Sequence, residues 1–207
     1  MQATELIVEW VDELERKVRL RVEGLSIEQL AWRPDPRANP ISATVWHFSR
    51  WLDLMAVCAL GGRPQDQQLW FTQGWADRTS YDPRGLGEHG YGTMTGYTLE
   101  EVDGIPALSA DELLTYLGQA CEALRAYLFV LDPDTIRAPA FGTVLPEPER
   151  SPPEGLDRIT PPFRGSDESI SRVEWLTIIL TGSLCHVGEV DAFNHMRGRL
   201  RAPAAES

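Results

Sequence analysis

The sequence is poor in several residue types, and each shortage excludes a class of protein. It has three cysteines among 207 residues, Cys58, Cys121 and Cys185, which are far apart and show no CxxC spacing. That pattern predicts reduced thiols in a cytoplasmic protein rather than a disulfide framework. Because each cysteine is flanked by apolar residues, we expect all three thiols to be buried and unreactive.

Basic residues and long apolar runs are also scarce. The chain has 19 lysines and arginines against 31 acidic residues, and no segment concentrates the basic ones. A surface that follows a phosphate backbone needs clustered Lys and Arg, so the sequence predicts no nucleic-acid partner. The longest apolar run near the end, residues 175–180, is far short of the ~20 residues of a membrane helix. Residues 1–13 carry acids where a signal peptide would be basic and then apolar. We therefore expect a cytoplasmic protein that binds no membrane.

What the sequence does contain is helical periodicity. Between residues 4 and 23, apolar side chains recur every three or four positions and charged side chains fill the other face, which predicts an amphipathic helix over Thr4–Glu23. A second helix is expected from Ala43 to about Leu60, with Ser42 as its N-cap. Apolar residues on nearly every side of this second helix indicate that it is central and buried on more than one face.

Two further helices are expected in the second half of the chain. Ser109 and Glu112 have the spacing of a capping box, so a third helix should begin there and end before Pro133. A fourth is expected from about Ser169 to Leu200. Four long helices joined by irregular segments predict an all-α bundle.

The connections between the expected helices are long. Residues 63–108 are the least regular part, and their glycine- and aromatic-rich stretch 85–97 is typical of a functional loop or of a cover over a site. Residues 137–166 hold seven prolines and predict a second irregular connection, with a weak hairpin signal at 141–145. We find no repeat and no domain boundary, so residues 1–200 should form one domain and 201–207 a frayed tail.

Four histidines are the residues best suited to chemistry, and their spacing decides which can act together. His195 follows His186 by nine residues, about half a turn out of phase, so these two cannot face one site on a straight helix. His47 and His186 lie on different expected helices. Such side chains can assemble a metal centre in the core of a bundle, or each can simply be a hydrogen-bonded core residue.

Four segments make the chain resemble the DinB-like superfamily. They are Gly24–Pro34, which reads GLSIEQLAWRP; Asn39–Asp53, which contains His47; Leu69–Arg78 together with Gly90–Gly92; and His186–Val190 together with Arg197–Gly198. The third of these is similar to an actinobacterial-type branch. The resemblance implies a four-helix bundle with up-up-down-down topology and long irregular connections.

The resemblance also implies a divalent metal, nickel or zinc, held by three ligands. One ligand maps to His47 and another to His186. The remaining ligand, four residues before His186, maps to Gly182, which has no ligand atom. A site with two histidines and water, a site with a replacement ligand, and a metal-free pair of histidines therefore all remain open. The replacement ligands considered are Glu189, Cys185 and His89.

Two kinds of function follow from the resemblance. Members include thiol-dependent S-transferases and isomerases that use mycothiol, bacillithiol or glutathione. In that case the metal or the histidine pair would lower the pKa of a low-molecular-weight thiol, with Arg50 and His89 contacting the anionic parts of this cofactor. The alternative is a non-catalytic small-molecule-binding or stress-associated protein without metal. Its tryptophans would line an apolar pocket or simply pack the core. No catalytic residue is assigned, and a homodimer is expected.

Overall fold

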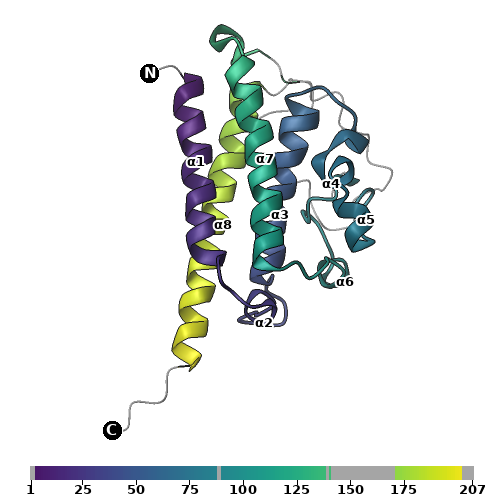
Figure 1. Cartoon of the computed structure of the whole chain (residues 1–207), viewed down its shortest axis with the longest axis vertical. Helices are drawn as coiled ribbons and strands as arrows, with labels where there is room; N and C mark the ends of the chain where they lie inside the picture. Colours follow the sequence, from purple (N-terminus) through teal and green to yellow (C-terminus); the bar gives the residue numbers. More distant parts are fainter. Residues whose placement is uncertain (1–2, 88–89, 139, 141–170, 202–207) are drawn as a thin grey trace.

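Every regular element of the described chain is a helix. The computed structural model describes residues 3–87, 90–138, 140 and 171–201. Its four long helices are α1 (Ala3–Val22), α3 (Ile41–Leu54), α7 (Ala110–Val130) and α8 (Arg172–Arg201) (Figure 1). The prediction of an all-α protein is confirmed.

The four long helices enclose one hydrophobic core. Helix α7 lies against α1 and α3, and α8 lies against the same two helices. The apolar residues whose spacing predicted α1 are the ones that it buries, namely Ile7, Val11, Leu14, Val18 and Val22. Helix α3 buries 11 of its 14 residues, as expected for a central helix. Burial of these side chains is the main stabilising contribution, at about 1.5–3 kcal/mol for each large one.

Helices α3 and α8 run in opposite directions. His47 on α3 faces His186 on α8, and four residues later along α3 Trp51 faces Trp175, which comes earlier on α8. The ring centroids of the two tryptophans are 6.4 Å apart. Moving forward along α3 therefore means moving backward along α8.

The remaining contacts fix the other directions. Just beyond the end of α7, the carbonyl of Ile136 accepts a hydrogen bond of 3.0 Å from the amide of Val173 at the start of α8, so α7 and α8 are antiparallel. Arg21 and Asp191 pair at 3.2 Å near the C-terminal parts of α1 and α8, which therefore run in parallel. In Figure 1 the helices run down, up, up and down in chain order. The implied up-up-down-down order is wrong, because residues 60–109 bring the chain back to the end where α3 began before α7 starts.

This long crossover contains more helix than the sequence indicated. A π-helical turn (Met55–Ala59) extends α3 to about the predicted end at Leu60, and short helices that the sequence did not indicate follow it. They are a 3₁₀ turn at Gln65–Gln67, α4 (Leu69–Thr72), α5 (Trp75–Thr79) and α6 (Leu99–Asp103). Two further short helices, α2 (Ile27–Leu30) and a 3₁₀ turn at Pro133–Thr135, lie in the other connections.

Helix ends match the expectations in part. Helix α7 begins with the predicted capping box of Ser109 and Glu112. Helix α3 begins at Ile41 with Pro40 as its N-cap, two residues before the predicted start, because the extended backbone at Pro40 ends the preceding segment. Helix α8 begins at Arg172. The weak hairpin at 141–145 and the last six residues lie outside the described residues.

Helix α8 has a property that the search for apolar runs did not detect. Between Arg172 and Gly198 it is long and apolar enough to cross a membrane by length and composition, although a core helix of a soluble protein passes the same test. A third of its most apolar stretch is buried against the rest of the chain. Its apolar residues are interrupted by small and polar ones, which is why no continuous run stands out in the sequence.

Candidate functional site

The fold brings His47 and His186 into contact. His47 lies in the second turn of α3, and His186 lies midway along α8. Their ring centroids are 4.9 Å apart and their planes are nearly perpendicular, at 87°. Because α3 and α8 are neighbours in the bundle, two residues separated by 139 positions in the sequence form one pair.

Each imidazole is held through its Nδ1 atom. Nδ1 of His47 donates to the carbonyl oxygen of Thr93, and Nδ1 of His186 is 2.7 Å from a carboxylate oxygen of Glu189. A carbonyl and a carboxylate can only accept, so the hydrogen in each ring belongs on Nδ1. Within the described residues, this leaves the Nε2 lone pair of both rings for a ligand. An imidazole that binds a metal usually has its other nitrogen held in this way.

His47 is neutral over the physiological pH range. The pKa of His47 is lowered from 6.5 to about 4, mainly by burial and also by the nearby His186, while the Thr93 carbonyl and Glu189 oppose the shift. A protonated imidazole has no lone pair to offer. The low pKa therefore keeps His47 in the form that can bind a metal or accept a proton.

Gly182 and Glu189 decide how many ligands the pair could recruit. A Cβ atom built on Gly182, one turn before His186, would meet no other atom within 4 Å, so there is open space where the expected third ligand would be. Glu189 is exposed and holds the His186 ring, which makes it an orienting group rather than the ligand considered from the sequence. No group of three or more His, Cys, Asp or Glu side chains suited to a metal occurs within the described residues.

The donor set thus fits a metal only in part. Two oriented imidazoles can occupy two coordination positions, whereas catalytic zinc sites have three protein ligands and one open position. His89, which was considered both as a ligand and as a cofactor contact, lies outside the described residues.

Comparisons with known proteins bear on the fold that carries this pair. The model of the DinB superfamily matches residues 11–160. The chain belongs to the DinB superfamily. Within the solved structures, a conserved protein from Enterococcus faecalis is similar to this DinB-superfamily chain with a TM-score of 0.69 and 18% identity, covering 94% of this chain and 96% of the other. At that identity the likeness shows the fold alone. No curated protein matches the chain. The actinobacterial-type branch stays a prediction.

Arg50 is not at the surface of this DinB-superfamily protein. Its side chain is completely buried, forms an ion pair of 3.2 Å with Asp53 and donates to the Tyr116 hydroxyl at 3.1 Å. Its Nε atom donates to the carbonyl of Gly92. The expected contact with an anionic cofactor therefore does not fit, because the charge is enclosed and already paired.

Asp53 compensates the buried charge of Arg50. Burial raises the pKa of Asp53, and the positive charge of Arg50 opposes that rise together with hydrogen bonds from the amides of Leu69 and Trp70 and from the Tyr116 hydroxyl. With four donors directed at the carboxyl group, we take the pair as ionised.

The tryptophans expected near the site mainly fill the core. Trp46, Trp70 and Trp75 are buried, and Trp70 packs edge-on against Trp46 and stacked on Trp75. Their rings therefore pack against one another rather than line an apolar pocket. Of the cysteines, Cys58 and Cys121 are buried as predicted, and burial raises the pKa of each thiol to about 12. Cys185 is exposed, contrary to the prediction, because its apolar neighbours point to other sides of α8.

The segment that holds His47 was only partly anticipated. The sequence predicts that the glycine-rich stretch covers a site, and Thr93 within this stretch contacts His47. Thr93 itself was missed, since the contact uses its backbone carbonyl and no side-chain pattern indicates it. His195 is exposed and faces away from the pair, as its spacing predicted.

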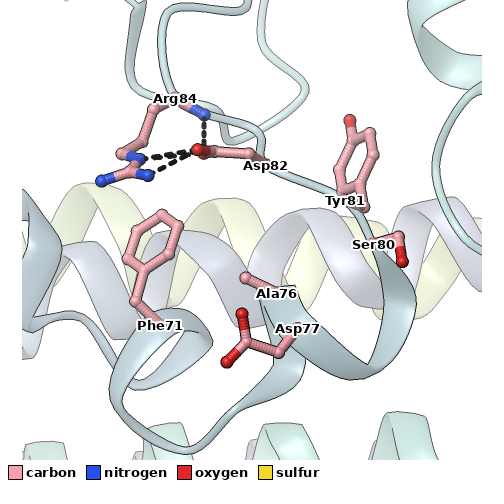
Figure 2. A pocket seen from close by; sticks show the side chains of 7 residues that line it. All are labelled: Phe71, Ala76, Asp77, Ser80, Tyr81, Asp82 and Arg84. Carbon is pink, nitrogen blue, oxygen red and sulfur yellow. Dashed lines mark hydrogen bonds and ion pairs between the residues drawn. The ribbon is translucent and has the colours of Figure 1, made fainter.

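A surface pocket of about 320 Å³ lies away from the histidines, on the crossover. Figure 2 shows the side chains around it, which come from α4, α5 and the segment after α5. Arg84 forms a two-pronged ion pair with Asp82 and lies over the ring of Phe71, 4.5 Å from its centroid. The guanidinium is thus already paired, so the pocket offers no free cation to an anionic ligand.

Proposed function

We propose that His47 and His186 form the binding site of a cytoplasmic thiol-dependent S-transferase. In this proposal the site binds a divalent metal, nickel or zinc, and a low-molecular-weight thiol, which attacks an electrophilic small molecule. The observation that carries the proposal is the pair of neighbouring imidazoles whose Nδ1 atoms are both held by oxygen acceptors. Packing alone would not require both Nδ1 atoms to be held by acceptors, which leaves the Nε2 lone pair of each ring for a ligand.

The residues of the chain have separate roles in this proposal. His47 and His186 would hold the metal, and Glu189 would keep the His186 ring in place. A bound metal would lower the pKa of a coordinated thiol, so that thiolate is present near neutral pH. The open space beside Gly182 would admit the thiol where other members of the superfamily are expected to have a third protein ligand.

Metal binding is tested first. Protein purified without chelator is analysed for bound metal, and its affinity for nickel and zinc is measured with a competing chelator. We expect His47→Ala to lower the affinity by more than about 100-fold, since removing even an outer hydrogen-bond partner of a ligand costs about 10–100-fold. His195→Ala is the matched control, because His195 lies on α8 but is exposed on another face. Equal affinities in all three proteins would refute the metal site.

A gain-of-function variant tests the geometry independently. Gly182→His adds a third imidazole one turn before His186, where the backbone leaves room for it. We expect at least ten-fold tighter zinc binding than in the parent protein. Unchanged affinity would show that residues 182 and 186 do not face one metal position.

The reaction is tested with mycothiol, bacillithiol and glutathione and a generic electrophile. The proposal requires turnover that depends on one of these thiols and falls in His47→Ala. Thiol-independent reaction, or none with any of the three, would refute the transferase.

A second candidate is favoured by the missing third ligand. In the described residues no set of three metal-ligating side chains comes together. A non-catalytic protein that binds a small molecule at the same histidine pair, without metal, would need only the two imidazoles as hydrogen-bonding groups. Metal-free protein without thiol turnover, but with a ligand whose affinity falls in His47→Ala, would establish this alternative.

A further inference from the structure

Three side chains on one face of α3 hold the same short segment of the crossover. Arg50 and Trp51 follow His47 by three and four residues, so both lie next to His47 on the helix surface. Nε of Arg50 donates to the carbonyl of Gly92 at 3.2 Å, Nδ1 of His47 donates to the carbonyl of Thr93, and Nε1 of Trp51 donates to the Thr95 hydroxyl at 3.2 Å. The three acceptors are Gly92, Thr93 and Thr95, so all three contacts lie within a segment of four residues.

The backbone of this segment is in an unusual conformation. Gly92 has φ +64°, and a Cβ atom there would lie 2.4 Å from the carbonyl oxygen of Pro83. Met94 has φ +77°, which side chains larger than glycine rarely adopt, and it is buried. Such a conformation costs about 1–3 kcal/mol and persists only where surrounding contacts enforce it. The contacts from α3 are among those that enforce it.

Arg50 is well suited to fix this backbone because it is itself immobile. Its guanidinium is bound by Asp53 and Tyr116 and lies within 5.9 Å of the centroids of three aromatic rings, those of Trp46, Trp70 and Phe71. The Nε–H group therefore presents a fixed donor to Gly92. The next carbonyl in the chain, that of Thr93, is the one that determines which nitrogen of His47 carries the hydrogen.

We propose that Arg50 is a positioning residue for His47. Through Gly92 it fixes the Thr93 carbonyl, which keeps the hydrogen of His47 on Nδ1 and leaves the Nε2 lone pair free on the imidazole that contacts His186. The importance of this for binding rests on the proposed function, but the hydrogen position itself is a property of the metal-free protein.

The test is a long-range proton–nitrogen NMR correlation on metal-free, ¹⁵N-labelled full-length protein at pH 8, which shows which nitrogen of each histidine is protonated. In the parent protein we expect His47 to be a single Nδ1–H form, with widely separated nitrogen shifts. Arg50→Lys keeps a positive charge beside Asp53 but removes the Nε–H donor. We expect the two His47 nitrogen shifts to converge in this variant while those of exposed His195 stay unchanged. Arg63→Lys, at an exposed arginine, is the matched control and should leave all histidines unchanged.

Gly92→Ala reaches the same carbonyls without touching Arg50, and we expect the same convergence because its Cβ must displace the segment from Pro83. Unchanged His47 shifts in either variant, with the helical circular dichroism of the parent, would overturn the proposal. An Nε2–H form of His47 in the parent spectrum would refute the proposal whatever the variants show. If the parent protein shows a single Nδ1–H form of His47 but binds no metal, only the proposed function is refuted. If the parent protein binds metal but a folded variant leaves the His47 shifts unchanged, only the role of Arg50 is refuted.

Discussion

His47 shows how far a residue's surroundings determine its chemistry. The sequence indicates that it lies one turn inside a helix, which is compatible with an ordinary core histidine. The structure adds burial, a carbonyl on Nδ1 and a second imidazole beside it. The carbonyl belongs to a loop residue, Thr93, and the imidazole belongs to another helix, α8. No local pattern around residue 47 could therefore reveal these surroundings.

The low pKa of His47 makes stability depend on pH. In the unfolded chain His47 takes up a proton near pH 6.5, whereas in the folded protein it does so only near pH 4. Between these values the unfolded state binds more protons, so the free energy of unfolding falls as the pH is lowered through this window. The difference between the two pKa values corresponds to a loss of roughly 3 kcal/mol. Urea unfolding of the metal-free protein at pH 7 and at pH 4.5 measures it.

His47→Gln is the control for this effect. It removes the titrating group while keeping a side chain that can hydrogen-bond to Thr93, and His186 and Glu189, the titratable groups that face His47, remain. We expect the variant to lose less stability on acidification than the parent protein does. The same pH dependence in both would mean that folded His47 takes up its proton at an ordinary pH.

Among the helices, the short ones of the crossover depend most on tertiary contacts. Helix α4 has four residues, too few to be stable alone. Its first two amides donate to the carboxyl group of Asp53, 16 and 17 residues earlier in the chain. Asp53 thus acts as a cap supplied by another helix, which explains why the sequence around residues 69–72 gave no sign of a helix.

Asp53→Asn is expected to destabilise the protein by about 3–5 kcal/mol. The change leaves the charge of Arg50 buried without a counter-ion and weakens the cap of α4. The free energy of unfolding in urea gives the magnitude, and Asp77→Asn serves as control because Asp77 is exposed and should change stability by less than about 0.5 kcal/mol. A loss below 1 kcal/mol for Asp53→Asn would show that the carboxyl group is not ionised in the folded protein.

For the molecule as a whole, we predict a homodimer. Two thirds of the most apolar stretch of α8 is not buried, and Phe129 and Val130 at the end of α7 are 90% and 78% exposed. Soluble chains rarely leave extensive apolar surface uncovered, and pairing of two copies would cover some of it. Light scattering after size exclusion should give twice the chain mass of 23.2 kDa. A mass of one chain would contradict the prediction, and recovery only with detergent would point to a membrane instead.

The sequence by itself determined the helical class and the position of the long helices, because a 3.6-residue apolar period and a capping box are local signals. The same periodicity separated His186 from His195, and the resemblance to the DinB-like superfamily paired His186 with His47. Tertiary structure alone decided the helix directions, since a connection of about 50 residues can return the chain to either end of the bundle. It also decided that Arg50 is a buried, paired charge rather than a cofactor contact, and that the carbonyl of Thr93 orients His47. These outcomes depend on contacts between residues far apart in the sequence, several of which use backbone atoms. A pattern of residue types in the sequence does not indicate such contacts.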